Sequence, residues 1–131
     1  MENEIWKPIP GYEGLYEVSN LGRVRSIKYF NPANNKIYIR TRVLKPSKHE
    51  NGYLRVGLCK NCKEKKFRIH RLVGMVFISN PNNYLEINHI DGNKENNCVS
   101  NLEWCTREYN IKEACRLGLV TPPKRYPTKH F

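Results

Sequence analysis

The chain has 131 residues, with 23 Lys and Arg against 12 Asp and Glu, which gives a net charge of +11 and a pI near 9.6. Its length allows one domain, or one domain with a small appendage. A composition of 39% hydrophobic and 27% charged residues excludes a disordered chain, and the longest apolar run, residues 73–78, is too short to span a membrane. No apolar segment follows the acidic N-terminus and the five cysteines are an odd number, so we expect no secretory signal and a cytoplasmic location with reduced thiols.

The positive charge is concentrated in one part of the chain. Residues 21–72 carry fifteen Lys and Arg but only two Glu, whereas residues 73–117 carry four Lys and Arg against six Asp and Glu. A surface that serves only solubility usually mixes both signs. The basic stretch therefore indicates a polyanionic partner, with nucleic acid as the first candidate.

The first half of the chain is typical of short strands separated by turns. Residues 15–18 and 23–29 are strand-like and are separated by a turn. Residues 37–43, 53–58 and 66–69 then alternate between apolar side chains and Tyr, Arg or Lys. This period of two predicts a small twisted antiparallel sheet with an apolar inner face and a cationic outer face.

The second half changes its periodicity. Residues 70–78 predict a short helix, and short strands are expected at 86–90 and 102–105. A second helix should begin after Thr106, which is a favourable N-cap residue, and should end before Gly118, which suits a C-cap.

Four polar residues of the second half form a pattern with chemical meaning. His89 lies on one predicted strand and Asn110 on the helix that follows the next strand, so a β–β–α arrangement can bring them together. Hydrolysis of a phosphodiester needs a base that activates water, and imidazole suits this role near neutral pH. It also needs a hard cation on oxygen ligands, which the amides of Asn88 and Asn110 can supply. Asn101 can fix the intervening loop by hydrogen-bonding its backbone.

These residues belong to segments that resemble the HNH nucleases of phage homing endonucleases. The spacing of twelve residues from His89 to Asn101, and of nine more to Asn110, resembles the H-N-N variant of that family. Residues 5–28 are similar to the NUMOD-type motif that often precedes such nucleases. The resembling segments of the nuclease itself are IHRLV at 69–73, NHIDGNK at 88–94, NLEW at 101–104 and EYNI at 108–111.

The resemblance implies an α+β fold in three parts. Residues 1–66 would form an N-terminal twisted antiparallel β-sheet region that binds DNA and carries the NUMOD-type motif at 5–28. Residues 67–118 would form a ββα-metal (HNH) nuclease unit, and residues 119–131 an extended basic tail.

The resemblance also implies an activity, that of a metal-dependent DNA endonuclease. In it, His89 would be the general base, Asn88 and Asn110 would hold a Mg²⁺ or Mn²⁺ ion, and Asn101 would be the structural Asn of the motif. The family's ligand directly before the His is commonly Asp. Because Asn88 is neutral, we expect weak metal binding that relies on the DNA phosphate as a further ligand. If the chain is phage-encoded, it would act in the cytoplasm of the bacterial host.

DNA contacts are expected on the cationic strand faces, because a two-stranded ribbon fits the major groove of double-stranded DNA. The sequence leaves open the target site, nicking versus double-strand cleavage, and the oligomeric state. It also leaves open which side chains contact bases and which contact phosphates. The candidates are Arg23, Arg25, Arg40, Arg42, Arg55, Arg68, Arg71, Tyr38 and Tyr53.

Other interpretations stay open at this level. The neutral Asn88 also fits a non-catalytic DNA-binding protein with a degenerate HNH centre, and an RNA-directed or toxin-type nuclease is a third option. Cys59 and Cys62 have the spacing of a zinc-ligand pair, but a four-ligand site needs a second pair. We therefore expect free thiols on a hairpin in preference to structural zinc.

Overall fold

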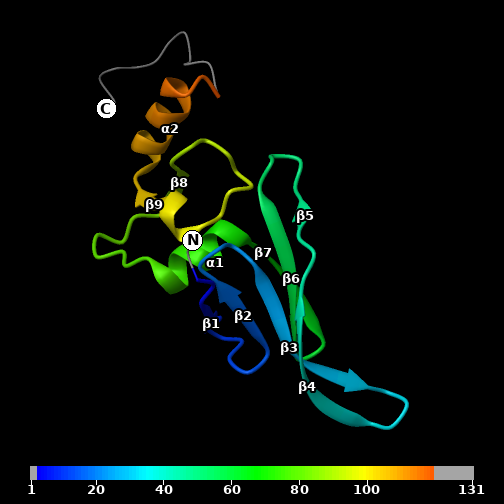
Figure 1. Cartoon of the computed structure of the whole chain (residues 1–131). Helices are drawn as coiled ribbons and strands as arrows, with labels where there is room; N and C mark the ends of the chain where they lie inside the picture. The colour runs from blue at the N-terminus through cyan, green and yellow to red at the C-terminus, as the bar shows by residue number, and fades with distance from the viewer. Residues whose placement is uncertain (1–2, 120–131) are drawn as a thin grey trace.

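The computed structural model describes residues 3–119, which form three antiparallel sheets and two α-helices (Figure 1). This arrangement confirms the α+β class. The first sheet has the strand order β1-β2-β3-β4, the second β5-β6-β7, and the third is the pair β8-β9. Apart from Leu119, the tail expected at 119–131 lies outside the described residues. The elements are β1 (Trp6–Pro8), β2 (Tyr16–Ser19), β3 (Val24–Asn31), β4 (Lys36–Val43), β5 (Ser47–Lys48), β6 (Leu54–Lys60), β7 (Lys63–Arg68), α1 (Ile69–Phe77), β8 (Glu86–His89), the 3₁₀ turn η1 (Val99–Asn101), β9 (Leu102–Cys105) and α2 (Arg107–Arg116).

A single hydrophobic core joins the two halves of the chain, with α1 packed against strands from all three sheets. Burying each large aliphatic side chain contributes about 1.5–3 kcal/mol, so this shared core is the main stabilising feature. Gly74 lets α1 approach the third sheet closely, because a Cβ there would lie 2.5 Å from Cδ1 of Ile87. The core is continuous across the expected boundary between residues 66 and 67. Its members are Ile9, Val18, Val24, Val56, Leu58, Ile69, Leu72, Val73, Ile87 and Leu102.

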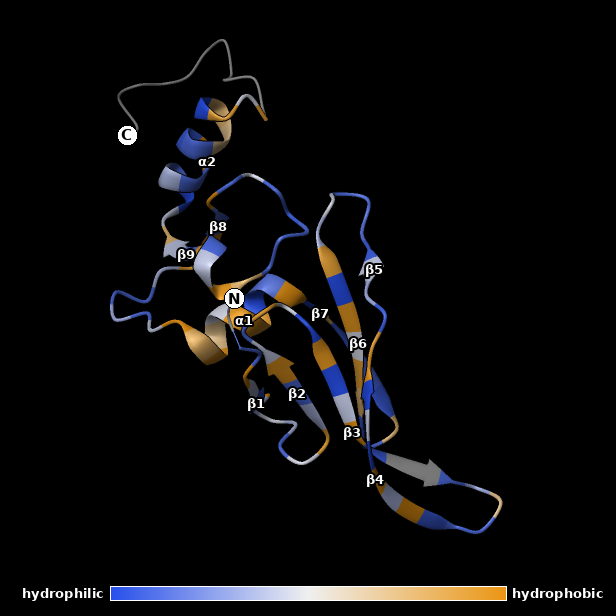
Figure 2. Cartoon of the chain, viewed as in Figure 1, coloured by the Kyte–Doolittle hydropathy of each residue, from blue (hydrophilic) through white to orange (hydrophobic). Residues whose placement is uncertain are grey.

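The hairpin of β3 and β4 projects beyond this core (Figure 1), and its apolar and polar residues alternate along the strands (Figure 2). Every residue of β4 is exposed, including Ile37 at 66% and Ile39 at 76%. The apolar inner face expected for residues 37–43 is therefore wrong. Period-two alternation shows which residues share a face, but it does not show whether a second layer covers that face.

The single sheet expected in the first half is also wrong in its membership. Residues 37–43 pair with β3 in the first sheet, whereas β6 and β7 pair with each other in the second. The hairpin of β6 and β7 closes through Asn61 and Cys62, whose φ angles of 53° and 63° fit a two-residue turn with both central residues left-handed.

The caps expected for the second helix are confirmed. The Thr106 Oγ1 atom accepts a hydrogen bond from the backbone N–H of Tyr109 at 3.2 Å, and Gly118 follows the helix with a φ of +75°. Both helices of residues 3–119 are too short to cross a membrane.

Candidate active site

The strand β8 and the helix α2 bring three of the predicted site residues to one pocket. Asn88 and His89 end β8, Asn110 lies in the first half of α2, and all three line the same cavity of about 240 Å³. The apolar part of its wall includes Leu117 and Leu119, beyond the end of α2. The β–β–α arrangement thus produces the convergence on which the proposed chemistry depends.

The imidazole of His89 is held in one orientation by a neighbouring amide. His89 is only 5% exposed, and its Nε2 atom lies 2.8 Å from Oδ1 of Asn97. Because an amide oxygen can only accept, Nε2 carries the proton and Nδ1 keeps its lone pair. Burial lowers the pKa of His89 and outweighs the opposing effects of the Asn97 hydrogen bond and the Asp91 charge. The ring is therefore neutral at neutral pH, as a general base must be.

Two carboxylates orient the candidate metal-ligand amides. The Nδ2 group of Asn88 donates to Glu103 Oε1 at 3.1 Å, and the Nδ2 group of Asn110 donates to Glu86 Oε1 at 3.0 Å. An ionised carboxylate only accepts hydrogen bonds, so each amide must turn its NH₂ group toward the acid. The carbonyl oxygen of each amide then points the other way and is available as a ligand.

These two acids were missed by the sequence reasoning, although a signal for them exists. Glu86 lies two residues before Asn88 on β8, and Glu103 is the cross-strand partner of Asn88 in the β8–β9 register. Residues two apart on a strand, and residues directly opposite, share one face of a sheet. Reading the two short strands as a pair would have placed both acids beside Asn88.

Asn101 organises the loop between β8 and β9. Its Nδ2 group donates to Asp91 Oδ1 and to the backbone oxygen of Asn96, both at 2.9 Å, and its Oδ1 accepts from the backbone N–H of Asp91 at 3.0 Å. Hydrogen bonds from the Asn96 side chain, the Asn93 backbone and Asn101 lower the pKa of Asp91. These bonds fix both ends of the loop that carries Asn97.

A stack of rings covers one side of His89. The ring of His70 lies 5.0 Å from that of His89 and 4.8 Å from that of Tyr53, and the Tyr53–His70 pair is stacked. Burial, followed by the charges of His89, Arg71 and Arg68, lowers the pKa of His70 to about 3. Its Nδ1 atom is buried without a hydrogen-bond partner. His70 therefore acts as a neutral packing element behind the candidate base.

Tyr53 itself lines the pocket and has two cations over its ring. The Lys94 Nζ atom lies 4.7 Å from the ring centroid and the Arg68 guanidinium 5.1 Å. Of the predicted DNA-binding residues, Tyr53 therefore lines the candidate catalytic pocket, and Arg68 lies over its ring.

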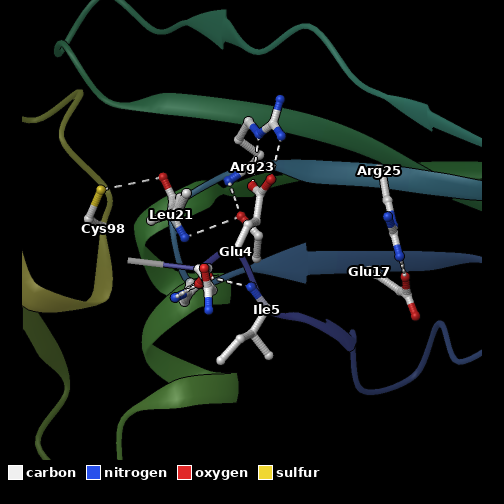
Figure 3. A network of polar contacts seen from close by, with 10 residues as sticks. Glu4, Ile5, Glu17, Leu21, Arg23, Arg25 and Cys98 are labelled. Carbon is white, nitrogen blue, oxygen red and sulfur yellow. Dashed lines mark hydrogen bonds and ion pairs between the residues drawn. The ribbon is translucent and has the colours of Figure 1, made fainter. Parts of the chain in front are cut away.

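Other predicted DNA-binding arginines are engaged within the protein. Arg25 pairs with Glu17 at 2.6 Å, and Arg23 pairs with Glu4 (Figure 3). Both guanidinium groups also lie over the ring of Trp6. Their charges are therefore partly balanced before any partner arrives.

Arg71 and Arg55 are also partly buried. The Arg71 Nη1 group donates to the backbone oxygen of Leu85 at 2.6 Å, and its guanidinium lies over Trp104. The Nε atom of Arg55 is buried without a hydrogen-bond partner. Tyr38, Arg40 and Arg42 lie on β4, where every residue is exposed to solvent.

All five cysteines are free thiols, and Cys59 and Cys62 are exposed at the β6–β7 hairpin. Within residues 3–119, no cluster of three or more His, Cys, Asp or Glu side chains is arranged to hold a metal ion. Metal binding at the pocket would therefore rest on the amide oxygens of Asn88 and Asn110.

Comparisons with known proteins agree with this geometry. Residues 67–112 match the HNH endonuclease family and residues 4–59 match the NUMOD4 motif. The chain thus combines a NUMOD4 motif with a ββα unit that matches the HNH endonuclease family over residues 67–112. The family resemblance found in the sequence is thereby confirmed.

Individual relatives include phage and viral proteins. DNA endonuclease I-HmuI of Bacillus phage SP01 is 40% identical over 119 residues, which cover 91% of this chain and 62% of that protein. An uncharacterised HNH endonuclease of Acanthamoeba polyphaga mimivirus is 51% identical over 70 residues, which cover 53% of this chain and 21% of the relative. A solved structure describing DNA binding and cleavage by the HNH homing endonuclease I-HmuI matches with a TM-score of 0.72 and 39% identity. That match covers 93% of this chain and 62% of the other. The chain thus spans about three fifths of the length of I-HmuI.

Proposed function

We propose that the chain is a metal-dependent DNA endonuclease that hydrolyses phosphodiester bonds at the pocket of Asn88, His89 and Asn110. The observation that carries this proposal is the convergence of a neutral imidazole and two directed amides on one cavity. The similarity to I-HmuI, an HNH homing endonuclease that binds and cleaves DNA, supports the same substrate.

The donor set fits a hard divalent cation such as Mg²⁺ or Mn²⁺. The oxygens of Asn88 and Asn110 are hard ligands, and the carboxylates of Glu86 and Glu103 lie one hydrogen bond further out. These acids offset the lack of charge on the two ligands, and partners of this kind commonly orient and tune metal ligands. A cation bound there supplies stabilisation of the negative charge on the phosphate and on the leaving 3′-oxygen.

The protein residues carry out the proton transfer. His89 takes a proton from the attacking water at Nδ1, while Asn97 accepts from Nε2–H and stabilises the imidazolium that forms. In-line attack on phosphorus then expels the 3′-oxygen and leaves 5′-phosphate and 3′-hydroxyl ends. Asn101 keeps the loop in place during this step through its bonds to Asp91 and Asn96.

Binding of double-stranded DNA is assigned mainly to residues 1–66. The β3–β4 hairpin is a two-stranded ribbon whose strand β4 is exposed and carries Tyr38, Arg40 and Arg42, and such a ribbon fits the major groove. Tyr53 and Arg68 would guide the backbone toward the pocket. The nuclease unit at 67–118 then receives the scissile phosphate.

The test is cleavage of supercoiled plasmid in the presence of Mg²⁺ or Mn²⁺. We expect the wild-type protein to nick or linearise the plasmid, and His89→Ala to bind DNA while cutting about 10²–10⁴-fold more slowly, because it lacks the general base. His49→Ala is the matched control, since His49 lies before β6 and does not line the pocket. Equal cutting by wild type and His89→Ala would contradict the mechanism.

The second candidate is a DNA-binding protein with a degenerate nuclease centre, which the neutral Asn88 favours. It predicts DNA binding without cleavage under either metal, so the same plasmid assay separates the two functions.

A further inference from the structure

The turn between β2 and β3 touches the segment that leads into β9, although the two lie more than seventy residues apart in sequence. The backbone N–H of Val99 donates to the carbonyl of Asn20 at 2.9 Å. The Cys98 thiol donates to the carbonyl of Leu21 at 3.6 Å (Figure 3). The turn belongs to the NUMOD4 match and the segment to the HNH match. Two family motifs therefore meet at this contact.

Gly22 is the residue of closest approach. Its φ is +87°, and a Cβ at this position would lie 2.8 Å from both the Cβ and the backbone oxygen of Asn97. A real Cβ does not approach other heavy atoms so closely, so only glycine fits here. The turn is itself fixed by Ser19, whose Oγ atom accepts from the backbone N–H groups of Leu21 and Arg23. Asn97 thus packs against a turn that side-chain hydrogen bonds hold in place.

The side chain of Asn97 faces the candidate base. Asn97 is 3% exposed, and its Oδ1 atom accepts the hydrogen bond from Nε2 of His89 at 2.8 Å. One buried residue therefore joins the turn of the N-terminal motif to the imidazole. A displacement of Asn97 by a few tenths of an ångström would lengthen the hydrogen bond that orients the ring.

We propose that Gly22 and Asn97 form a positioning pair, in which the turn of the N-terminal motif holds Asn97 and Asn97 holds the imidazole of His89. This inference rests on the proposed function, in which His89 is the general base. It makes the N-terminal motif a structural part of the cleavage site as well as a DNA-binding element. Asn97 and Gly22 are positioning residues, because neither contacts the reacting atoms.

The other polar and charged groups around His89 have separate anchors. His70 lies on α1, Tyr53 precedes β6, and Lys94 donates to the backbone oxygen of Asn51. Asp91 is held by Asn101. None of these contacts involves Gly22. A substitution of Gly22 is therefore expected to affect His89 through its contact with Asn97.

The chain offers a matched control for a substitution at Gly22. Gly11 has almost the same left-handed φ, +86°, but a Cβ built on it meets no atom within 4 Å. Gly22→Ala and Gly11→Ala therefore impose the same backbone strain, and only Gly22→Ala adds the clash with Asn97. The difference between the two variants isolates the contact.

The direct readout is the Nε2–H proton of His89 in NMR spectra of ¹⁵N-histidine-labelled protein without metal or DNA. A buried, hydrogen-bonded imidazole proton exchanges slowly with water, so we expect a resolved signal in wild type and in Gly11→Ala. We expect its loss in Gly22→Ala and Asn97→Ala, and its retention in Asn97→Asp, which keeps an acceptor oxygen. Retention of the signal in Gly22→Ala, or its loss in Gly11→Ala, would overturn the proposal.

The second readout separates catalysis from binding. In single-turnover plasmid cleavage, Gly22→Ala and Asn97→Ala should slow the reaction about 10–100-fold, the usual cost of losing a group that orients an active-site residue. The Kd for DNA should stay within about twofold of wild type. An equal loss of DNA affinity would show a purely structural defect and overturn the proposal. Because the NMR signal needs no catalysis, an inactive wild type would refute the nuclease function and still leave the positioning pair tested.

Discussion

The projecting β3–β4 ribbon and the pocket at the end of β8 both carry polar side chains, but these side chains differ in their exposure to solvent. The ribbon carries Lys and Arg and no acid between residues 24 and 43, and every residue of β4 is exposed. Asn88 and His89 of the pocket, and Asn97 behind His89, are 5% exposed or less, and each has a defined hydrogen-bond partner.

The difference shows what each region can do. Exposed charges in water interact weakly with one another and are screened by salt, so they suit the gripping of a polyanion. Buried polar groups need hydrogen-bond partners inside the protein, and these partners fix their orientation. Such groups are therefore sensitive to changes of pH and to small displacements of their partners. Substitutions in the ribbon should therefore change the salt dependence of DNA binding. Substitutions around the pocket should change metal affinity and the dependence of stability on pH.

The largest effect is expected from neutralising the ribbon. Changing Lys36, Arg40 and Arg42 together to Gln should make the negative slope of log affinity for DNA against log salt shallower by about 2–3, because each phosphate contact contributes roughly one. Fluorescence anisotropy at several salt concentrations measures this slope. The free energy of unfolding should change by less than about 0.5 kcal/mol per site, as is usual for exposed positions.

The paired arginines supply the contrast for this experiment. Arg23→Gln with Arg25→Gln removes charges that Glu4 and Glu17 already balance, so the salt slope should become shallower by clearly less than in the ribbon variant. If the slope became shallower by the same amount in both variants, the distinction between the exposed cations of β4 and the ion-paired Arg23 and Arg25 would be wrong.

A smaller effect is expected from the acids behind the metal ligands. Glu103→Gln removes one negative charge next to Asn88 and should weaken Mn²⁺ binding by about tenfold, as measured by titration calorimetry without DNA. Glu95→Gln is the control, because Glu95 is half exposed and pairs with Lys48 on the surface. Unchanged Mn²⁺ affinity in Glu103→Gln would show that the acid does not support the ligand site.

The last expected effect concerns acid stability. The pKa of His70 is lowered to about 3 from an ordinary value near 6.5, so below pH 6.5 the unfolded state binds a proton that the folded state does not. The free energy of unfolding should then fall with decreasing pH by up to roughly 1.4 kcal/mol per pH unit. His70→Phe keeps a ring in the stack and should show a shallower fall in urea unfolding between pH 7 and 5. Identical pH profiles would contradict the buried, neutral state of His70.

Much of the local structure was predictable from sequence because local signals determine it. Thr106 and Gly118 mark the ends of α2 through capping chemistry that needs no tertiary contact. The spacing of His89 and Asn110 was sufficient to predict their meeting at one mouth, since a β–β–α connection leaves few alternatives.

The remaining features depend on contacts that no local pattern contains. Ile39 is exposed because no element within residues 3–119 covers the ribbon, and the pairing of Arg25 with Glu17 follows from strand register. The hydrogen bond from His89 to Asn97 depends on the path of the loop at residues 90–97. The sequence showed this loop only as a polar segment with several asparagines. The family resemblance pointed to the candidate reacting groups, and the structure shows which residues hydrogen-bond to them.

The contact between Gly22 and Asn97 also bears on how such proteins can recombine. A gene that exchanges its N-terminal motif for that of a relative keeps its own Asn97. The turn that packs against Asn97 then comes from the other protein. Only donors with glycine at the tip of that turn would preserve the fit, so the two motifs are expected to be inherited as a matched pair. A library of chimaeras joined between residues 59 and 67 should be enriched, after selection for folded protein, in donors that satisfy this condition.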